Sequence, residues 1–542
     1  MSPVYYFSVP GLLLLLSSLW LATKVLQYIF AWRGTHTTKL NGPPSKSVIF
    51  GLSRYIAQSP DIHVEYEEWA NQYGPVYQIP VALGQKRIVL TDPKALLHFY
   101  SSERSVYTKT RSDRLLIDTL LGRGIIWAEG DMHKRQRKAL TPAFSNAAIR
   151  RLTTVFFDST HKLKTFWDAT LESQPDGAII EVEEWRVVLP HMDSIGLAGF
   201  SHDFKYLEGQ QSPVTKAFEA MQHTKTGLMS DLVFSLSFTF PFLLNLPTGR
   251  IRLFRELRRS MNVVAGRLLE NTRREKENNV TEELTDKSVI GLLLKAEGPR
   301  AELRMTQEEV ASQVGDRQPS LHTWALIELA KHQDKQDKLR KDVARFGGVD
   351  PTWDQLVSDL PYLDATVNEV LRLHPSLPGL LREAGTDDVI PLGTPIVTPS
   401  GETISSLTVA KGTTVLVPMR CINRSEAFWG PTAKVFEPER WFADVTVKAK
   451  ELQGYHHLLT FHDGPRTCLG KAFALAEFKA RIIFFHIYSQ AALFVLIRNF
   501  TFEFPDGPET PIETQIALVP RPKVVGHNGA TVPLRVRRVE TL

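Results

Sequence analysis

The sequence predicts a mainly α-helical protein with a minor β portion. Long segments repeat apolar residues at helical spacing, as in residues 131–144, 250–278 and 364–374. Short β-branched runs, bounded by glycine and proline, occupy residues 76–92 and recur between residues 382 and 418. The chain contains neither a long Gly/Ser or Pro/Gln linker nor an internal repeat, so we expect one large compact unit.

Composition excludes several classes of protein. The net charge of +5 is small for 542 residues, and lysine and arginine are interleaved with acidic residues. No basic patch therefore favours a nucleic-acid partner, and we expect none. Two cysteines cannot build a disulfide framework, which fits a reducing compartment.

The first 23 residues carry no charged side chain. As a helix they would span about 34 Å, which is enough to cross the hydrocarbon core of a bilayer. A secretory signal peptide is the alternative, but such a peptide normally begins with a basic region. Here the basic residues follow the apolar stretch: Lys24, Arg33, Lys39, Lys46 and Arg54. The positive-inside rule therefore predicts one N-terminal transmembrane helix with the rest of the chain in the cytosol.

Domain boundaries follow from this pattern. We assign residues 1–32 to the membrane anchor. Residues 33–48 form a basic, proline-containing hinge that includes the sequence NGPPS. Residues 49–542 form the globular body.

Within the body, the expected elements run in a simple order. Two strands occupy residues 76–92, and a helix occupies residues 131–144 until Pro142 interrupts it. A long amphipathic helix covers residues 250–278, with its many arginines on a solvated face. Further helices are expected at residues 323–332, 336–346 and 364–374, and short strands and turns between residues 382 and 418.

The stretch FHDGPRTCLG, residues 461–470, holds one of the two cysteines. Strong helix formers follow Cys468, so the cysteine stands where a helix would begin. Free backbone N–H groups and the helix dipole favour a thiolate at that position. The other cysteine, Cys421, lies in an apolar segment that reads as a strand, and we expect its thiol to be inert.

The residues around Cys468 suit a loop built against a flat ligand. Gly464 can turn the backbone at positive φ, and Gly470 permits close approach of the ligand. Arg466 can pair with an anionic group, and Phe461 can cover one side. Together they satisfy the pattern Phe-x-x-Gly-x-Arg-x-Cys-x-Gly at every fixed position. This loop resembles the haem-binding loop of the cytochromes P-450, the haem-thiolate monooxygenases, in which the cysteine binds iron.

Two further motifs support the resemblance. Glu369 and Arg372 have the Glu-x-x-Arg spacing of the family's K helix, and FEPERW follows about seventy residues later. A lone Glu-x-x-Arg is a weak signal, because such ion pairs are common on exposed helices. The resemblance implies that Arg440 joins Glu369 and Arg372 in a structural triad that locks the cysteine loop.

The resemblance also implies residues that bind the haem propionates. The segment HKRQRKALTPAF looks like the family's C helix, where His133 and Arg137 would face a propionate. His133 takes a place more often held by tryptophan. Arg382 matches another arginine that contacts a propionate. Taken without the family, His133 reads as a surface histidine.

The resemblance covers nearly the whole chain and implies its activity. The chain looks like a fungal microsomal cytochrome P-450: a haem-dependent monooxygenase with a haem b cofactor whose axial ligand is the Cys468 thiolate. It would sit in the endoplasmic reticulum membrane, with its catalytic domain in the cytosol. An NADPH-cytochrome reductase would supply electrons, and O2 would oxidise an apolar small-molecule substrate. A fungal setting suggests secondary metabolite biosynthesis, with terpenoid tailoring as one candidate.

One departure from the family bears on catalysis. The family's long central helix carries an acid–alcohol pair that helps deliver protons to dioxygen. Between Val314 and Thr323 this chain reads GDRQPSLH, which lacks such a pair, so the catalytic residues stay unassigned. Asp316, Ser320 and Thr323 are the possible substitutes. A haem-binding relative with lost or altered oxygen activation is therefore the alternative function.

A second departure lies after the cysteine, where residues 482–490 look like an insertion. Both departures fit either a misjudged exon boundary or a true variant of the family, and the sequence does not decide between them.

Overall fold

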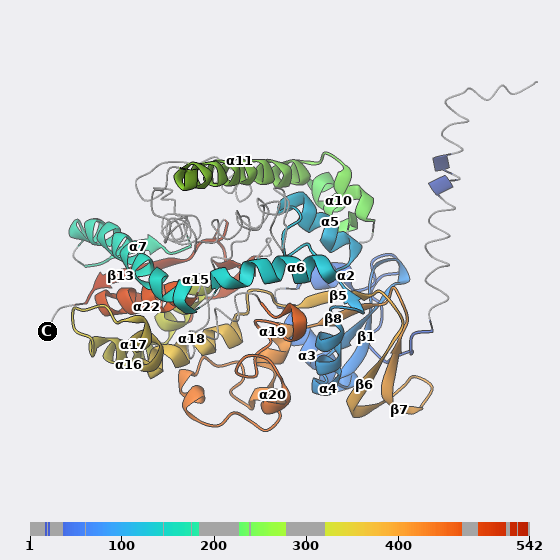
Figure 1. Ribbon diagram of the computed structural model, residues 1–542. Helices are drawn as coiled ribbons and strands as arrows, with labels where there is room; N and C mark the ends of the chain where they lie inside the picture. Colours follow the sequence, from blue (N-terminus) through green and yellow to red (C-terminus); the bar gives the residue numbers. More distant parts are fainter. Residues whose placement is uncertain are drawn as a thin grey trace, which may run out of the picture.

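The protein is described here from a computed structural model (Figure 1). The structure describes residues 36–59, 61–144, 146–174, 176–183, 227–237, 240–277, 320–468, 486–515, 521–527 and 529–539, together with residues 17–18 and 20–21. Helices form most of this part of the chain, and the main sheet lies at one side of it (Figure 1). The predicted class, mainly α with a minor β portion, is confirmed.

The main sheet has the strand order β1-β2-β8-β5-β3. Strands β1 and β2 pair antiparallel, which confirms the two strands expected at residues 76–92, and β8 joins β2 in parallel. A hairpin of β6 and β7 lies beside helix α4 (Figure 1). The bounds are β1 Val76–Pro80, β2 Lys86–Leu90, β3 Tyr107–Thr108, β5 Leu380–Ala384, β6 Asp388–Val397, β7 Thr403–Val409 and β8 Thr414–Val417.

Two smaller sheets contain the C-terminal strands. One has the order β10-β13-β4, and the other is the antiparallel pair β11–β12. The central strand β13 thus joins residues near the C-terminus to a segment about 350 residues earlier. The bounds are β4 Ala178–Glu181, β10 Phe500–Glu503, β11 Ile512–Gln515, β12 Arg521–Val524 and β13 Pro533–Arg538.

The helices lie where the apolar spacing predicts them. The first half of the chain contributes α2 Ser53–Gln58, α3 Ile62–Tyr73, α4 Pro93–Ser102, α5 Arg111–Leu120, α6 Gly130–Leu140, α7 Asn146–Glu172, α10 Leu228–Ser237 and α11 Gly249–Glu277. The second half contributes α15 Ser320–Lys331, α16 Gln333–Ala344, α17 Trp353–Ser358, α18 Pro361–Leu373, α19 Met419–Arg424, α20 Glu426–Trp429 and α22 His486–Asn499. Helix α6 ends at Leu140, and a 3-10 turn that contains Pro142 follows it, because proline cannot donate the next helical hydrogen bond.

Helices α7, α16, α18 and α22 enclose the largest part of the core. In α7, Trp167 is fully buried and packs edge-on against Phe500 and Phe502 of β10. Apolar side chains of α22 from residue 491 to residue 497 are buried nearly all round the helix. A helix that is apolar on every side belongs inside a large core, so the part of α22 that follows the suspected insertion is integrated into the fold.

The described part of the predicted hinge, residues 36–48, is docked onto the sheets. The Thr38 amide donates to the Thr408 carbonyl at 2.9 Å, and Leu40 is buried. Gly42 lies so close to β1 that an added Cβ would stand 1.8 Å from the Gln78 carbonyl oxygen. This segment is therefore fixed to the body rather than hanging free.

No helix among the described residues is both long enough and apolar enough to cross a membrane. The predicted anchor, residues 1–32, lies almost wholly outside the described residues, so the anchor stays a prediction.

Candidate active site

The loop that ends at Cys468 is held by its own backbone and by α4. Gly464 has φ +65°, which confirms the expected left-handed turn, and an added Cβ would lie 2.4 Å from the Tyr100 carbonyl oxygen. The Cys468 amide donates to the Phe461 carbonyl at 2.9 Å and closes the loop. Any side chain at position 464 would separate this loop from α4.

Helix α6 reaches the loop through Arg137. Its guanidinium Nη1 donates to the Thr467 carbonyl at 2.6 Å, directly beside Cys468. Burial lowers the pKa of Arg137, while the charge of the Cys468 thiolate raises it. Cys468 itself is exposed at the surface of the described residues. Gly470 and the helix expected after the cysteine lie outside the described residues.

Two buried arginines converge on Glu103 next to this loop. Arg382 of β5 donates from Nε to a carboxylate oxygen of Glu103 at 2.6 Å. Arg466 of the cysteine loop donates from Nε to the Glu103 backbone carbonyl at 3.3 Å and forms an ion pair with Glu129. The sequence motifs assign Arg382 and Arg466 to one site, and the fold brings them together there.

Lys109 adds a further cation that the motifs do not single out. Its Nζ donates to Glu129 at 3.1 Å, yet burial and the charges of Arg466 and Arg382 lower the pKa of Lys109 to about 6. A buried site with undercompensated positive charge is costly unless an anion enters it. One carboxylate oxygen of Glu103 also has no hydrogen-bond partner among the described residues.

His133 lies one helical turn before Arg137 on α6 and is half-buried. Burial, together with the charges of Lys109 and Arg137, lowers the pKa of His133 to about 4. The side chain is therefore neutral at physiological pH and can donate one hydrogen bond to an anion. Thus His133 borders the same cation cluster as Lys109.

The predicted contacts of Glu369 are present. Its two carboxylate oxygens accept from Arg372 Nη2 at 2.7 Å and Nε at 2.9 Å, and both side chains are fully buried. Arg440 Nε lies 3.5 Å from Glu369 Oε1, and Trp441 Nε1 donates to Oε2 at 3.0 Å. The Glu437 backbone amide also donates to Oε1 at 3.0 Å.

The same network continues to the cysteine loop through Asn423. Arg372 donates to the Asn423 carbonyl at 2.9 Å. The Asn423 side chain accepts from the Leu459 amide at 3.1 Å and donates to Thr460 Oγ1 at 2.8 Å. Because Phe461 opens the cysteine loop directly after Thr460, the buried ion pair fixes the start of that loop.

The interval without an acid–alcohol pair is described only from residue 320 onward. Thr323 is buried, and its hydroxyl donates to a carboxylate oxygen of Glu183 at 2.5 Å. Arg521 Nε contacts the other oxygen of Glu183 at 2.5 Å. Thr323 is therefore committed to a buried structural ion pair, which argues against it as a substitute proton donor. Asp316 lies outside the described residues.

Cys421 lies on helix α19, so the expected strand is wrong at this position. Strand β8 ends at Val417, and Pro418 is the N-cap residue from which α19 begins. The Cys421 side chain is buried, and burial raises the pKa of its thiol far above the usual value. A buried neutral thiol is unreactive.

Known proteins resemble the chain over its whole length. The sequence profile of the family "Cytochrome P450" matches residues 41–526. The chain belongs to the cytochrome P450 family. Two proteins of Ampulloclitocybe clavipes, cytochrome P450 monooxygenases claQ and claP, are 51% and 50% identical to it, each over 100% of both chains. Cytochrome P450 monooxygenase 128 of Postia placenta is 30% identical over 96% of both chains.

Membership settles the class of enzyme and the cofactor. Cytochromes P450 are haem-dependent monooxygenases, hence oxidoreductases, in which a cysteine thiolate binds the haem iron. They use O2, a substrate and a redox partner. The similar fungal relatives are consistent with a role in secondary metabolism.

Proposed function

We propose that this P450 oxidises an apolar small molecule with O2 and with electrons from an NADPH-cytochrome reductase. The observation that carries the proposal is the junction of α6 with the cysteine loop, where Arg137 lies beside Cys468. An adjacent guanidinium stabilises the thiolate form that an iron ligand requires. When bound, the haem supplies the chemistry that activates dioxygen.

We assign the haem contacts to residues of this chain. The Cys468 sulfur would bind the haem iron, Phe461 would cover the haem on the cysteine side, and Gly470 would leave room for it. The undercompensated cations beside the loop fit the two propionates of haem b, because anions there would restore charge balance. The propionate contacts are His133, Arg137, Arg382 and Arg466.

The cellular location and the pathway are part of the same proposal. Residues 1–32 would anchor the enzyme in the endoplasmic reticulum membrane, with the catalytic domain in the cytosol, where the reductase delivers electrons. Terpenoid tailoring in fungal secondary metabolism is the candidate pathway class. Support comes from the uncharged N-terminal stretch and from the fungal relatives.

A haem-binding relative with lost or altered oxygen activation is the second candidate. One observation favours it: Thr323, an alcohol close to the missing acid–alcohol pair, is held by Glu183. A chain without a proton donor near dioxygen would bind haem and accept electrons but form little product.

The two candidates are separated by two measurements on the purified full-length protein. The absorption spectrum of the reduced, carbon-monoxide-bound protein reports haem with a thiolate ligand. Product formation with the reductase and NADPH then distinguishes a monooxygenase from an altered relative. A protein without any haem absorption would contradict both candidates.

A further inference from the structure

Aromatic side chains form a row from the cysteine loop to the surface of the protein. The ring of Phe461, which opens the loop, meets the Tyr455 ring edge-on with centroids 5.7 Å apart. Tyr455 meets His456 at 4.3 Å, and His456 meets Trp441 at 5.8 Å. Trp429 lies 5.9 Å from Trp441 at the far end of this aromatic row. Because Trp441 is half-buried and His456 is exposed, the row reaches solvent.

The aromatic row starts in the same loop as Cys468. The Phe461 carbonyl accepts from the Cys468 amide at 2.9 Å, and the buried Tyr455 ring packs directly against Phe461. Among aromatic side chains, those of tyrosine and tryptophan lose an electron most readily. The row therefore holds three side chains that can be oxidised, Tyr455, Trp441 and Trp429, and Phe461 and His456 fill the spaces between them.

The charges beside the two tryptophans differ in sign. Trp441 Nε1 donates to Glu369 Oε2 at 3.0 Å, so a positive charge on an oxidised Trp441 indole would lie next to a carboxylate. The guanidinium of Arg372 lies over the Trp429 ring, 5.5 Å from its centroid, and disfavours a positive charge there. Although Glu369 also pairs with Arg372, its oxygen is the charged atom bonded directly to the Trp441 indole. Electrostatics thus makes Trp441 the preferred electron donor.

We propose that the aromatic row passes electrons from Trp441 to the cysteine loop and gives the enzyme a second activity, the reduction of hydrogen peroxide. Peroxide is an expected by-product, because the interval between Val314 and Thr323 lacks an acid–alcohol pair. When bound in the loop, the haem supplies the chemistry that reacts with peroxide. The row supplies electrons that would otherwise be taken from the cofactor or from side chains around it.

This activity consumes two electrons for each hydrogen peroxide. The O–O bond breaks, two protons are taken up, and two water molecules form. Trp441 gives up one electron at a time, while its Nε1 hydrogen stays in the bond to Glu369. Tyr455 passes each electron on and loses its hydroxyl proton only until an electron from Trp441 restores it. A reductant of the ascorbate class restores Trp441 at the surface: two ascorbate anions give the two electrons and release the two protons.

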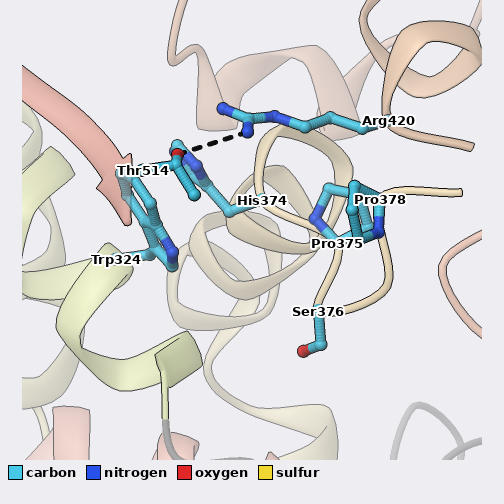
Figure 2. A pocket seen from close by; sticks show the side chains of 7 residues that line it. All are labelled: Trp324, His374, Pro375, Ser376, Pro378, Arg420 and Thr514. Atoms are coloured by element: carbon cyan, nitrogen blue, oxygen red, sulfur yellow. Dashed lines mark hydrogen bonds between the residues drawn. The ribbon is translucent and has the colours of Figure 1, made fainter. Parts of the chain in front are cut away.

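Trp324 provides a matched control outside the aromatic row. Its ring stacks on His374 with centroids 4.0 Å apart, beside the small cleft that Arg420 also lines (Figure 2). Among the aromatic contacts of the described residues, none joins Trp324 or His374 to the row. Trp324 is therefore a tryptophan with a close aromatic neighbour that does not belong to the proposed route.

Electron paramagnetic resonance tests the route. Haem-loaded protein is mixed with hydrogen peroxide, without reductase or substrate, and frozen. We expect a tryptophan radical in the wild type and, in peptide mass spectra, oxidation of the Trp441 indole. Trp441→Phe should lose both signals. Tyr455→Phe keeps its ring contacts but cannot be oxidised, so it should weaken both signals several-fold, whereas Trp324→Phe should leave them unchanged.

Loss of haem absorption is the second readout. With ascorbate present, wild type and Trp324→Phe should survive repeated additions of peroxide, whereas Trp441→Phe and Tyr455→Phe should lose their haem absorption several-fold faster. Because Trp441 also bonds to Glu369, the reduced, carbon-monoxide-bound spectrum first establishes that each variant is loaded with haem. Tyr455→Phe leaves that bond intact and keeps the test decisive if Trp441→Phe folds poorly.

A radical of unchanged strength in Trp441→Phe and Tyr455→Phe would overturn the proposal, and so would a signal that disappears in Trp324→Phe. The proposal rests on the haem in the cysteine loop but not on the monooxygenase reaction, because no substrate or reductase is present. A protein that forms oxidised product yet shows no tryptophan radical would remove the electron route alone.

Discussion

Glu369 and Arg372 form a bidentate ion pair from which solvent is wholly excluded. The two carboxylate oxygens lie 2.7 and 2.9 Å from Arg372 nitrogens, and neither side chain is exposed. Arg372 also donates hydrogen bonds to the backbone carbonyls of Asn423, Ala433 and Val435. The pair thus ties α18 to the chain that leads into the cysteine loop.

Replacing Glu369 by alanine should therefore damage folding and haem retention rather than turnover alone. The change leaves a buried guanidinium without its counter-charge, which costs roughly 3–5 kcal/mol. We expect a large drop in the yield of folded, haem-loaded protein, measured by the haem-to-protein absorbance ratio. Glu270→Ala serves as control, because the Glu270–Arg274 pair is similarly short but exposed on α11. A Glu369→Ala protein with full haem content would show that the pair does not hold the loop.

The two cysteines should respond oppositely to substitution by serine. Cys468→Ser should abolish the thiolate-type absorption of the reduced, carbon-monoxide-bound protein, because an alcohol does not replace a thiolate on iron. Cys421→Ser should keep that absorption, since the Cys421 thiol is buried in the core behind β1 and β2. An unchanged spectrum in Cys468→Ser would refute the assignment of the iron ligand.

Sequence patterns predicted much of this architecture because the decisive signals are local. The apolar spacing of residues 364–374 predicted α18, and the β-branched runs of residues 76–92 predicted β1 and β2. Gly464 was predictable because only glycine readily adopts φ +65° against a neighbouring carbonyl. The family motifs then predicted that Arg382 and Arg466 lie at one site.

Other site residues leave no local signal. Lys109, Glu103 and Glu129 carry no recognisable spacing, and they meet the cysteine loop only through the packing of α4 and α6. Cys421 was misplaced in a strand because its apolar neighbours fit a strand or a buried helix equally well. The pairing of Thr323 with Glu183, 140 residues away, depends on tertiary structure alone.

The lowered pKa of Lys109 predicts that the free energy of unfolding of the haem-free protein depends on pH, and bound haem should remove this dependence. In the haem-free protein the pKa of Lys109 is about 6, whereas an unfolded lysine titrates near 10.4. Between these values the unfolded chain binds the extra proton, so the free energy of unfolding should rise as the pH rises from about 6 to about 10. Propionate anions should raise the pKa of Lys109 in the haem-loaded protein and flatten this dependence. Urea unfolding of both forms between pH 6.5 and 9 measures it.

Lys109→Met provides the matching variant. It should remove the pH dependence from the haem-free protein and, by deleting a cation near the propionates, speed haem transfer to an acceptor apoprotein by about tenfold. Haem transfer at the wild-type rate would show that Lys109 does not face the haem.

Membrane attachment should depend on residues 1–32, whereas residues 36–41 should serve stability. We expect the intact chain to sediment with membranes and a chain that lacks residues 1–32 to be released in large part. Removing residues 1–40 should release it too but lower its stability, because Leu40 is buried and Thr38 bonds to Thr408. Fractionation followed by thermal unfolding of the two truncated proteins tests both points. An intact chain that is fully soluble, or cleaved after residue 23 and secreted, would contradict the anchor.

The interval between Val314 and Thr323 predicts that NADPH oxidation is weakly coupled to product formation. Without an acid–alcohol pair, protons should reach dioxygen poorly, so most NADPH oxidised with the reductase should yield peroxide or superoxide rather than product. The ratio of product to NADPH, measured with an apolar compound that the enzyme converts, gives this coupling. A segment bearing Gly-x-Glu-Thr, built between Val314 and Thr323, should raise the ratio several-fold.

Thr323→Val is the control for that experiment, because the Thr323 hydroxyl is bonded to Glu183 and its loss should lower stability while leaving the coupling of the unaltered chain unchanged. If Thr323→Val instead reduced the coupling, the Glu183–Thr323 pair would itself be delivering protons. Tight coupling that persists in both the unaltered chain and Thr323→Val would direct attention to Asp316 or Ser320. In that case the departure from the family motif would be a replacement of the proton donor rather than its loss.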